Sequence, residues 1–447
     1  MASERQYIEL FRSQRQLLEA GSCAPLNARR DRAASLLEAN GLPTCRVERY
    51  KYTDAEAAFA PDYGLNLKRT APQADPYRTY RCNVPNLSTA LYFVTNDVVC
   101  PARDKAAPLP GGAVVCSLQQ AAFSHAELLE KHYHRAAAYE YDGVTELNTL
   151  LVQDGLFIYL PDGVCLNSPI QIVNVSAATT NLMSNRRILI IAGKDAQASF
   201  LFCDHADGSS RYLTTQVVEV YAGENARLDM YSIEETNEKN VRFNNLYVEQ
   251  QAGCSVSYNG VTLHNGLTRN RMDFRMLGPG AHVETCGAVI ADSEEHVDNS
   301  IIAEHAAPSC TSNMLYKYVL DGKSEAAFAG KVLIQEGAQE SLSEQTSANL
   351  CVSPEAHAYS QPMLEIYADN VKCNHGSTVG KLDEAALFYM RQRGIGEKEA
   401  RLLLQHAFVN DVIQRVQFEP LRDRLSHLVE MRFRGELSKC KGCKMCK

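Results

Sequence analysis

From about Leu147 to Gly380 the chain alternates short apolar runs with turn residues, and no helical pattern interrupts them. One unit, small or polar turn residues followed by an alternating apolar strand, recurs in AGKDAQASFLF, AGENARLDMYS, AGCSVSYNGV, PGAHVETCGAV and DGKSEAAFAGKVLI. The turn residues are Gly163, Gly193, Gly223, Gly253, Gly280, Pro308, Gly322, Gly337 and Pro354, with further turn-like points at Gly208 and Gly266. Their spacing is 27 to 30 residues at first and 14 to 17 later. A supersecondary unit that repeats in phase predicts a solenoid, and we expect a parallel β-helix because a β-sandwich has turns about every 8 to 12 residues.

The sequence that follows the repeats predicts helices. Asp383 is a good N-cap, Leu382 and Leu387 stand at the positions of a hydrophobic staple, and Gly394 follows the last turn as a C′ residue. A second helix is expected over residues 397–408, and a third has Pro420 in its first turn.

The sequence before the repeats is mixed. Apolar positions at helical spacing predict helices near 7–18 and 29–40, and the runs 90–94 and 113–115 predict strands. We therefore expect a mainly β protein in four parts: an N-terminal α+β region (1–140), a right-handed parallel β-helix core (141–380), a C-terminal helical domain (381–436) and a Cys/Lys-rich tail (437–447).

Composition and charge exclude several classes of protein. The chain is 45% hydrophobic and 22% charged, and its formal net charge of -8 argues against a nucleic-acid binder. No window of 18 apolar residues occurs, and the charged N-terminus does not look like a signal peptide, so we expect a cytoplasmic protein that does not enter membranes.

The cysteines fit a reducing compartment. There are 15 of them, an odd number without regular spacing, so a disulfide framework is not expected. Cys165, Cys203, Cys254 and Cys286 lie in apolar or strand-like runs and are interpreted as small buried hydrophobes.

Two groups of residues carry metal-binding chemistry. In Val371-Lys372-Cys373-Asn374-His375 the period of two puts Cys373 and His375 on one face of a strand, where a thiolate and an imidazole can reach one metal ion or cluster. The same pair also suits a purely structural role, in which both side chains only pack. The tail places Cys440, Cys443 and Cys446 at three-residue intervals among lysines, a second candidate metal site.

The sequence offers few candidates for a catalytic or nucleotide-binding site. Asp292, Glu294 and Glu295 are the candidate carboxylates of a rival hypothesis, a β-helix polysaccharide lyase or hydrolase. GSTVGKL at 376–382 has three residues between its glycines and ends in Leu, so it is not a phosphate-binding P-loop. Arg46, Glu48, Arg49 and Lys51 form a charged stretch, either a solvated face or a docking surface.

Three segments resemble the SufB/SufD family of the Suf iron-sulfur cluster assembly machinery. ADNVKCNHGSTVGKLDEAALFYMRQRGI, residues 368–395, is similar to the family signature nearly residue for residue. GLPTCRVERYKYTD at 41–54 and the run ELNTLLVQDGLFIYLPDGVCLNSPIQI from Glu146 are weaker matches, and Tyr50 stands where the family has Trp. The chain length and the lack of clustered N-terminal cysteines fit the SufD branch better than the SufB branch.

The resemblance implies a non-catalytic scaffold subunit with a β-helix core. Such a subunit pairs with SufB, docks the ABC-type ATPase SufC through its C-terminal helices and contributes residues to a nascent iron-sulfur cluster at the subunit interface. At the matching positions His375 is the first expected cluster residue and Cys373 the second. The residues expected at the SufC contact are Asp383, Glu384, Phe388, Tyr389, Arg391 and Arg393. ATP would be used only by the partner, FAD binding by the complex is left open, and the isolated chain would be able to form a homodimer.

Overall fold

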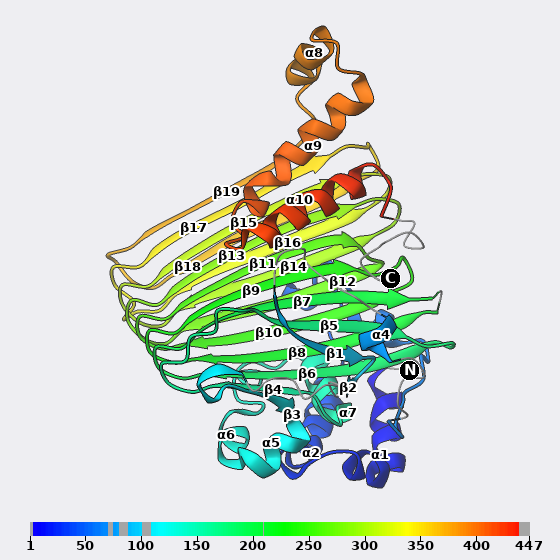
Figure 1. Cartoon of the computed structure of the whole chain (residues 1–447), viewed down its shortest axis with the longest axis vertical. Coiled ribbons are helices and arrows are strands. Elements are labelled where there is room, and N and C mark those ends of the chain that lie inside the picture. Colours follow the sequence, from blue (N-terminus) through cyan, green and yellow to red (C-terminus); the bar gives the residue numbers. More distant parts are fainter. Residues whose placement is uncertain (1–2, 70–74, 80–87, 101–108, 209, 438–447) are drawn as a thin grey trace.

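The computed structural model describes residues 3–69, 75–79, 88–100, 109–208 and 210–437. The protein is mainly β, with 41% strand and 27% helix, and its strands form a parallel β-solenoid of about 7 turns (Figure 1). Helices lie before and after the solenoid in the sequence. The predicted mainly β architecture, with a parallel β-helix between flanking helices, is confirmed.

The N-terminal part contains two long helices, several short ones and, among the residues that the structure describes there, three strands. Its elements are α1 (Glu4–Ala20), α2 (Ala24–Asn40), the 3₁₀ turn η1 (Glu48–Tyr50), α3 (Ala55–Phe59), α4 (Pro76–Thr79), β1 (Ala90–Thr95), β2 (Val98–Cys100), η2 (Pro110–Gly112), β3 (Val114–Ser117), α5 (Leu118–Ser124), α6 (Ala126–His132) and α7 (Gly143–Leu151).

The solenoid strands and the C-terminal helices follow. The strands are β4 (Leu156–Leu160), β5 (Ile170–Ala177), β6 (Leu182–Ala192), β7 (Gln197–Asp207), β8 (Tyr212–Ala222), β9 (Arg227–Glu235), β10 (Val241–Gln250), β11 (Ser255–His264), β12 (Leu267–Met276), β13 (His282–Ala291), β14 (His296–His305), β15 (Thr311–Leu320), β16 (Glu325–Ile334), β17 (Leu342–Cys351), β18 (His357–Ile366) and β19 (Lys372–Gly380). The helices are α8 (Glu384–Gln392), α9 (Glu397–Ile413) and α10 (Glu419–Phe433).

Successive solenoid strands alternate between two facing sheets. We call them the odd sheet, in the order β19-β17-β15-β13-β11-β9-β7-β5-β1-β2, and the even sheet, in the order β18-β16-β14-β12-β10-β8-β6-β4-β3. Each coil therefore contributes one strand to each sheet, and only β1–β2 and β3–β4 pair antiparallel among the described strands. β1, which the sequence assigned to the N-terminal region, extends the odd sheet through its parallel pairing with β5.

The turns explain the two spacings in the sequence. Gly193 and Gly223 lie between an even strand and the next odd strand, one full coil apart, whereas Gly208 and Gly322 lie at turns from odd to even strands. Where turn residues stand at both turns of a coil, their spacing along the sequence is half of one full coil.

The predicted burial of four cysteines is confirmed for three of them. Cys203, Cys254 and Cys286 are buried, but Cys165 is exposed. Cys165 lies between Val164 and Leu166, two buried members of the interior, so the alternation along an extended chain turns its side chain outward.

The interior between the two sheets is mainly apolar, and a row of polar side chains runs through it. Ile188, Val220, Phe274 and many similar side chains fill it. The polar row consists of Asn174, Gln216, Asn244, Asn270, Asn299 and Tyr318, each hydrogen-bonded to the next at distances of 2.8 to 3.4 Å. Side-chain amides both donate and accept, so a stack of them satisfies its own buried polar groups.

N-terminal helices cover the outer face of the even sheet at the first coils. The α7 amide of Asn148 donates to the carbonyl of Arg186 (3.0 Å) and to the hydroxyl of Thr215 (2.9 Å). Arg187 and Glu219 form an ion pair of 2.7 Å on this face, and both side chains are fully buried.

C-terminal helices cover the outer face of the odd sheet. Asn259 of β11 donates to the carbonyl of Val412 at the end of α9 (2.8 Å), and Arg432 of α10 reaches Asp292 and Glu295 in the turn before β14. In Figure 1 the N-terminal helices and α8 lie at opposite ends of the solenoid. None of the described helices is both long enough and apolar enough to span a bilayer.

Candidate functional site

In the part of the chain that the structure describes, no further coil stacks on the last coil of the solenoid. Among the strands that the structure describes, β18 pairs with β16 alone and β19 with β17 alone, so each is the outermost strand of its sheet. No heavy atom lies within 4 Å of the position that a side chain would take at Gly376 or Gly380 of β19. Within the described residues, the outward hydrogen-bonding edges of β18 and β19 therefore have no strand partner at this end of the molecule.

Cys373 and His375 both lie on β19, on the side that faces the interior. Cys373 is in register with Ser343 and His375 with Gln345, and both β17 partners are buried. Neighbours in register on parallel strands share a face, so the two side chains follow the inner face of the odd sheet. Cys373 is half-buried against the interior residues, and His375 is exposed. The pair thus lies at the open end of the interior.

Burial raises the pKa of the Cys373 thiol, so the thiol is protonated at neutral pH in the isolated chain. A soft cation that approaches would favour the thiolate and displace the proton. Among the residues that the structure describes, no group of three or more histidine, cysteine, aspartate or glutamate side chains is arranged to hold a metal ion. The site therefore offers two donors, one sulfur and one ring nitrogen.

The second metal candidate cannot be placed. Cys440, Cys443 and Cys446 lie outside the described residues.

The helix that follows β19 begins and ends where the sequence predicts. The Asp383 carboxylate accepts from the amides of Ala385 (2.8 Å) and Ala386 (3.2 Å), Leu387 is buried, and Gly394 has φ of 83°. The following helix, α9, runs five residues past the predicted end at 408, to Ile413.

One face of α8 is exposed and aromatic. Phe388 and Tyr389 are 62% and 59% exposed. The Arg393 guanidinium lies 4.9 Å from the Tyr389 ring centre and donates to its hydroxyl (2.7 Å). Arg391 pairs with Glu397 at 3.5 Å. The Asp383 carboxylate caps the helix, so it is already hydrogen-bonded within the chain. The helix α8 stands beyond β19, and its two aromatic rings are exposed (Figure 1).

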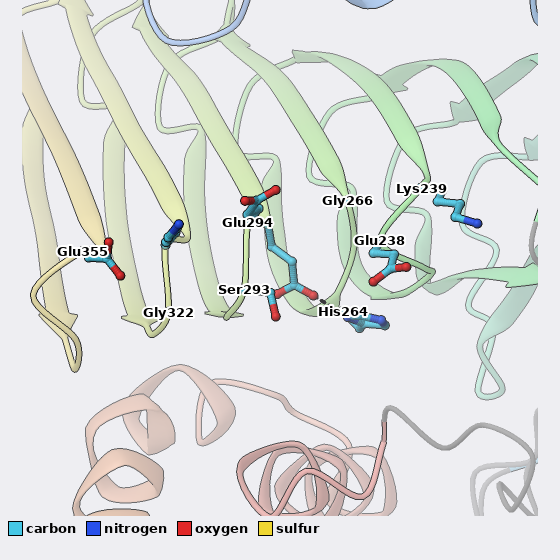
Figure 2. Close-up of a pocket in the computed structure, with 10 residues that line it drawn as sticks. Glu238, Lys239, His264, Gly266, Ser293, Glu294, Gly322 and Glu355 are labelled. Carbon is cyan, nitrogen blue, oxygen red and sulfur yellow. Dashed lines mark hydrogen bonds and ion pairs between the residues drawn. The ribbon is translucent and has the colours of Figure 1, made fainter.

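A cleft of about 690 Å³ lies along the turns that lead from odd to even strands. Figure 2 shows Glu238, Glu294 and Glu355 on separate turns of this cleft, with His264 near Glu238. Glu295 also lines it, but its carboxylate bonds His264 and Arg432. This is where the carboxylates of the polysaccharide-enzyme hypothesis lie.

The geometry does not favour acid-base catalysis by two of the candidates, Asp292 and Glu295. Arg432 bonds both Asp292 (2.7 Å) and Glu295 (3.0 Å). Burial alone would raise the pKa of Asp292, but the Arg432 guanidinium brings it below the ordinary value, so Asp292 stays ionised. A general acid needs a raised pKa. These residues anchor α10 to the solenoid.

The charged stretch near residue 49 was expected to be a solvated face or a docking surface, but Arg49 within it is paired inside the molecule. Arg49 is only 16% exposed and forms a double hydrogen bond with Asp273 on β12. A run of alternating charges gives no sign of which members have a buried partner, and Asp273 lies more than two hundred residues away in the chain.

Comparison with known proteins finds two family models that match the chain. A family model described as "SUF system FeS cluster assembly, SufBD core domain" matches residues 174–408, more than half of the chain, and one described as "SufBD protein N-terminal region" matches residues 1–172.

Individual relatives carry related names. An iron-sulfur cluster assembly SufBD family protein of Synechocystis is 25% identical over 413 residues, 90% of each chain. SufD of Bacillus subtilis is 23% identical over 322 residues, 71% of this chain and 74% of its own, and SufD of Escherichia coli is 28% identical over 173 residues, 39% and 41%. The chain therefore belongs to the SufBD family of iron-sulfur cluster assembly proteins.

Proposed function

We propose that this chain is a SufD-type scaffold subunit, without a turnover site of its own, that supports cluster assembly at an interface with a SufB-type subunit. Its link to iron-sulfur cluster assembly follows from family membership. The observation that carries the finer proposal is the position of Cys373 and His375 on the outermost strand of the odd sheet, with His375 exposed and Cys373 half-buried.

The edge of β19 supports pairing with another chain. The Lys372 amide donates to the Ser341 carbonyl on the β17 side. Amides alternate in direction along a strand, so those of Cys373, His375 and Val379 point to the free edge. Unpaired edge groups of this kind are a template for a strand from a second chain.

Exposed apolar side chains surround the same end. Ile366, Tyr367 and Val379 are 40%, 62% and 57% exposed, and all three belong to the last coil or its turn. Burial of such side chains is worth about 25 cal/mol per Å² of apolar surface, so they favour association.

Two donors on one chain suit a shared site. Iron in clusters is usually held by four protein ligands, so a second subunit would supply the others. The cluster is cargo here, and a ligand set divided between two chains comes apart when the chains move, which allows the cargo to leave. Cys373 would supply a thiolate and His375 a neutral imidazole, both of which suit iron.

The α8 helix is the proposed contact for a SufC-type ATPase. Phe388 and Tyr389 offer two exposed rings, Glu384 and Arg391 lie on the same helix, and Arg393 is its C-cap. Aromatic and arginine side chains are the residue types that dominate protein interfaces. ATP would be hydrolysed only by that partner.

Two reciprocal variants test the two contacts by co-purification with SufB-type and SufC-type subunits. Val379→Glu puts a charge on the exposed end of β19 and is expected to lose the SufB-type subunit while it retains the SufC-type one. Phe388→Glu is expected to do the opposite. Phe123→Glu, at a 91% exposed position on α5, is the matched control and keeps both partners. Retention of the SufB-type subunit by Val379→Glu would contradict the proposed interface.

A further inference from the structure

The segment from Glu48 to Asp54, which we call the strap, crosses the outer face of the even sheet. Its first half is firmly held. Arg49 bonds both oxygens of Asp273 on β12 (2.7 and 3.1 Å), and the Tyr50 hydroxyl donates to Asp142 (2.6 Å). Both ion-pair partners are largely excluded from water, so these bonds are strong.

The middle of the strap is held by the next strands. The Thr53 hydroxyl donates to Asp298 on β14 (2.7 Å) and contacts the ring of His296 (3.2 Å). The guanidinium of Arg269 on β12 lies 4.7 Å from the Tyr50 ring centre. The strap is thus a rigid support that starts at the N-terminal region and is fixed on both sides of Tyr52.

Tyr52 connects the strap to β18, the last strand of the even sheet. Its ring stacks on that of Tyr359 on β18, with centroids 4.8 Å apart and an angle of 20° between the planes. The Lys51 ammonium lies 5.4 Å from the Tyr52 ring centre on the same segment. Tyr52 and Tyr359 are therefore a direct link between the N-terminal region and the terminal coil.

β18 has few other contacts that would hold it in place. It has one strand neighbour in its sheet, and its side chains range from half-buried to exposed. At its ends the amides of His357 and Tyr367 donate to Ser324 and Ile334 on the β16 side (3.0 and 2.9 Å). Terminal strands with few buried contacts open locally at low free-energy cost.

We propose that Tyr52 is a positioning residue that clamps β18 through Tyr359 and so keeps the terminal coil ordered for subunit pairing. The effect on subunit pairing rests on the proposed function, because an ordered edge matters for pairing only if a partner binds at that end. The clamp itself is a property of the isolated chain. An aromatic stack contributes enough to change the opening equilibrium of the strand roughly two- to tenfold.

Hydrogen exchange on the full chain tests the clamp. In Tyr52→Ala the amides of residues 357–367 are expected to exchange roughly two- to tenfold faster than in wild type. Tyr52→Phe keeps the stacked ring and is expected to match wild type, and Phe123→Ala, which removes an exposed ring far from this coil, is the control. Equal exchange of 357–367 in wild type and Tyr52→Ala would overturn the inference.

Affinity for the SufB-type subunit tests the consequence. Tyr52→Ala is expected to bind it more weakly by the same factor, with no loss in Tyr52→Phe. Faster exchange with unchanged affinity would overturn the positioning role. Weaker binding in both variants, with unchanged exchange, would instead make the Tyr52 hydroxyl a direct contact and also overturn it. If wild type does not bind the SufB-type subunit at all, the proposed function fails, while the exchange result still decides whether the clamp exists.

Discussion

Glu234 gives the protein a stability that depends on pH. It lies on β9 inside the solenoid, where its carboxylate accepts from the Thr268 hydroxyl (2.7 Å) and is 3.6 Å from the Arg242 guanidinium. Burial raises the pKa of Glu234 from 4.5 to about 7, and the nearby Arg242 guanidinium, which lowers it, is shared with Asp204. The folded protein therefore holds a proton that the unfolded chain has lost between pH 4.5 and 7.

The sign of the effect follows from proton binding. Stability falls with rising pH wherever the folded state binds more protons, so this group costs stability progressively from pH 4.5 to about 7 and by a constant amount above that. A difference of this size corresponds to about 3 kcal/mol. An unfolding entropy of about 2.1 cal/mol/K per residue over 447 residues converts this to roughly 3 °C in Tm.

Glu234→Gln keeps the shape and the Thr268 contact and removes the titration. Calorimetry between pH 5 and pH 8.5 is expected to show nearly equal Tm values for the two proteins at pH 5 and a variant that is roughly 3 °C more stable at pH 8.5. A difference that is constant with pH, or a variant that is less stable at pH 8.5, would refute the reasoning, since Glu234 would then be ionised and usefully paired.

Glu219→Gln is the control of opposite sign. Burial would raise the pKa of Glu219, but Arg187 at 2.7 Å brings it below its ordinary value, so the carboxylate is ionised throughout this range. The Gln variant is expected to be less stable than wild type at every pH tested, because it leaves a buried guanidinium without its partner.

Three further variants test the anchors of the fold. Asp383→Ala removes the acceptor of two helix amides and is expected to cost α8 about 1 kcal/mol, seen as faster exchange in 384–392; unchanged protection there would exclude the cap. Arg432→Met leaves Asp292 and Glu295 without their cation and is expected to destabilise the chain by about 3 kcal/mol, and an unchanged Tm would show that α10 is held by apolar contacts alone. Burial lowers the pKa of His305 to about 4, so stability is lost as pH falls from 6.5 toward 4; His305→Asn is expected to lack this acid loss, and an identical acid profile would contradict it.

The sequence was sufficient for the solenoid and for the start of α8. Turn residues that recur in phase leave few architectures, and Asp383, Leu387 and Gly394 each satisfy a local rule of helix termini. These features depend on neighbours in the chain, so they can be inferred without tertiary contacts. The position of Cys373 and His375 on one face follows from the strand period in the same way.

Contacts between segments that are distant in the chain could not be predicted from the sequence. The contacts of Arg49 with Asp273 and of Tyr52 with Tyr359 depend on how the N-terminal region folds back over the even sheet. The buried row that includes Asn244 repeats at 26 to 29 residues over much of its length, a period that a search for polar residues inside apolar strands would have detected. That His375 is exposed depends on the absence of another coil on β19, which strand alternation does not reveal.

The most direct measurement is the cluster content of the assembled complex under anaerobic reconstitution. Complexes with SufB-type and SufC-type subunits are prepared with wild type, with His375→Ala and with Asn374→Ala, whose exposed side chain lies on the opposite face of the same strand. We predict that His375→Ala forms the complex but shows much weaker visible cluster absorption per complex, while Asn374→Ala matches wild type. Equal absorption in His375→Ala and wild type would contradict the account and leave the chain a structural adaptor.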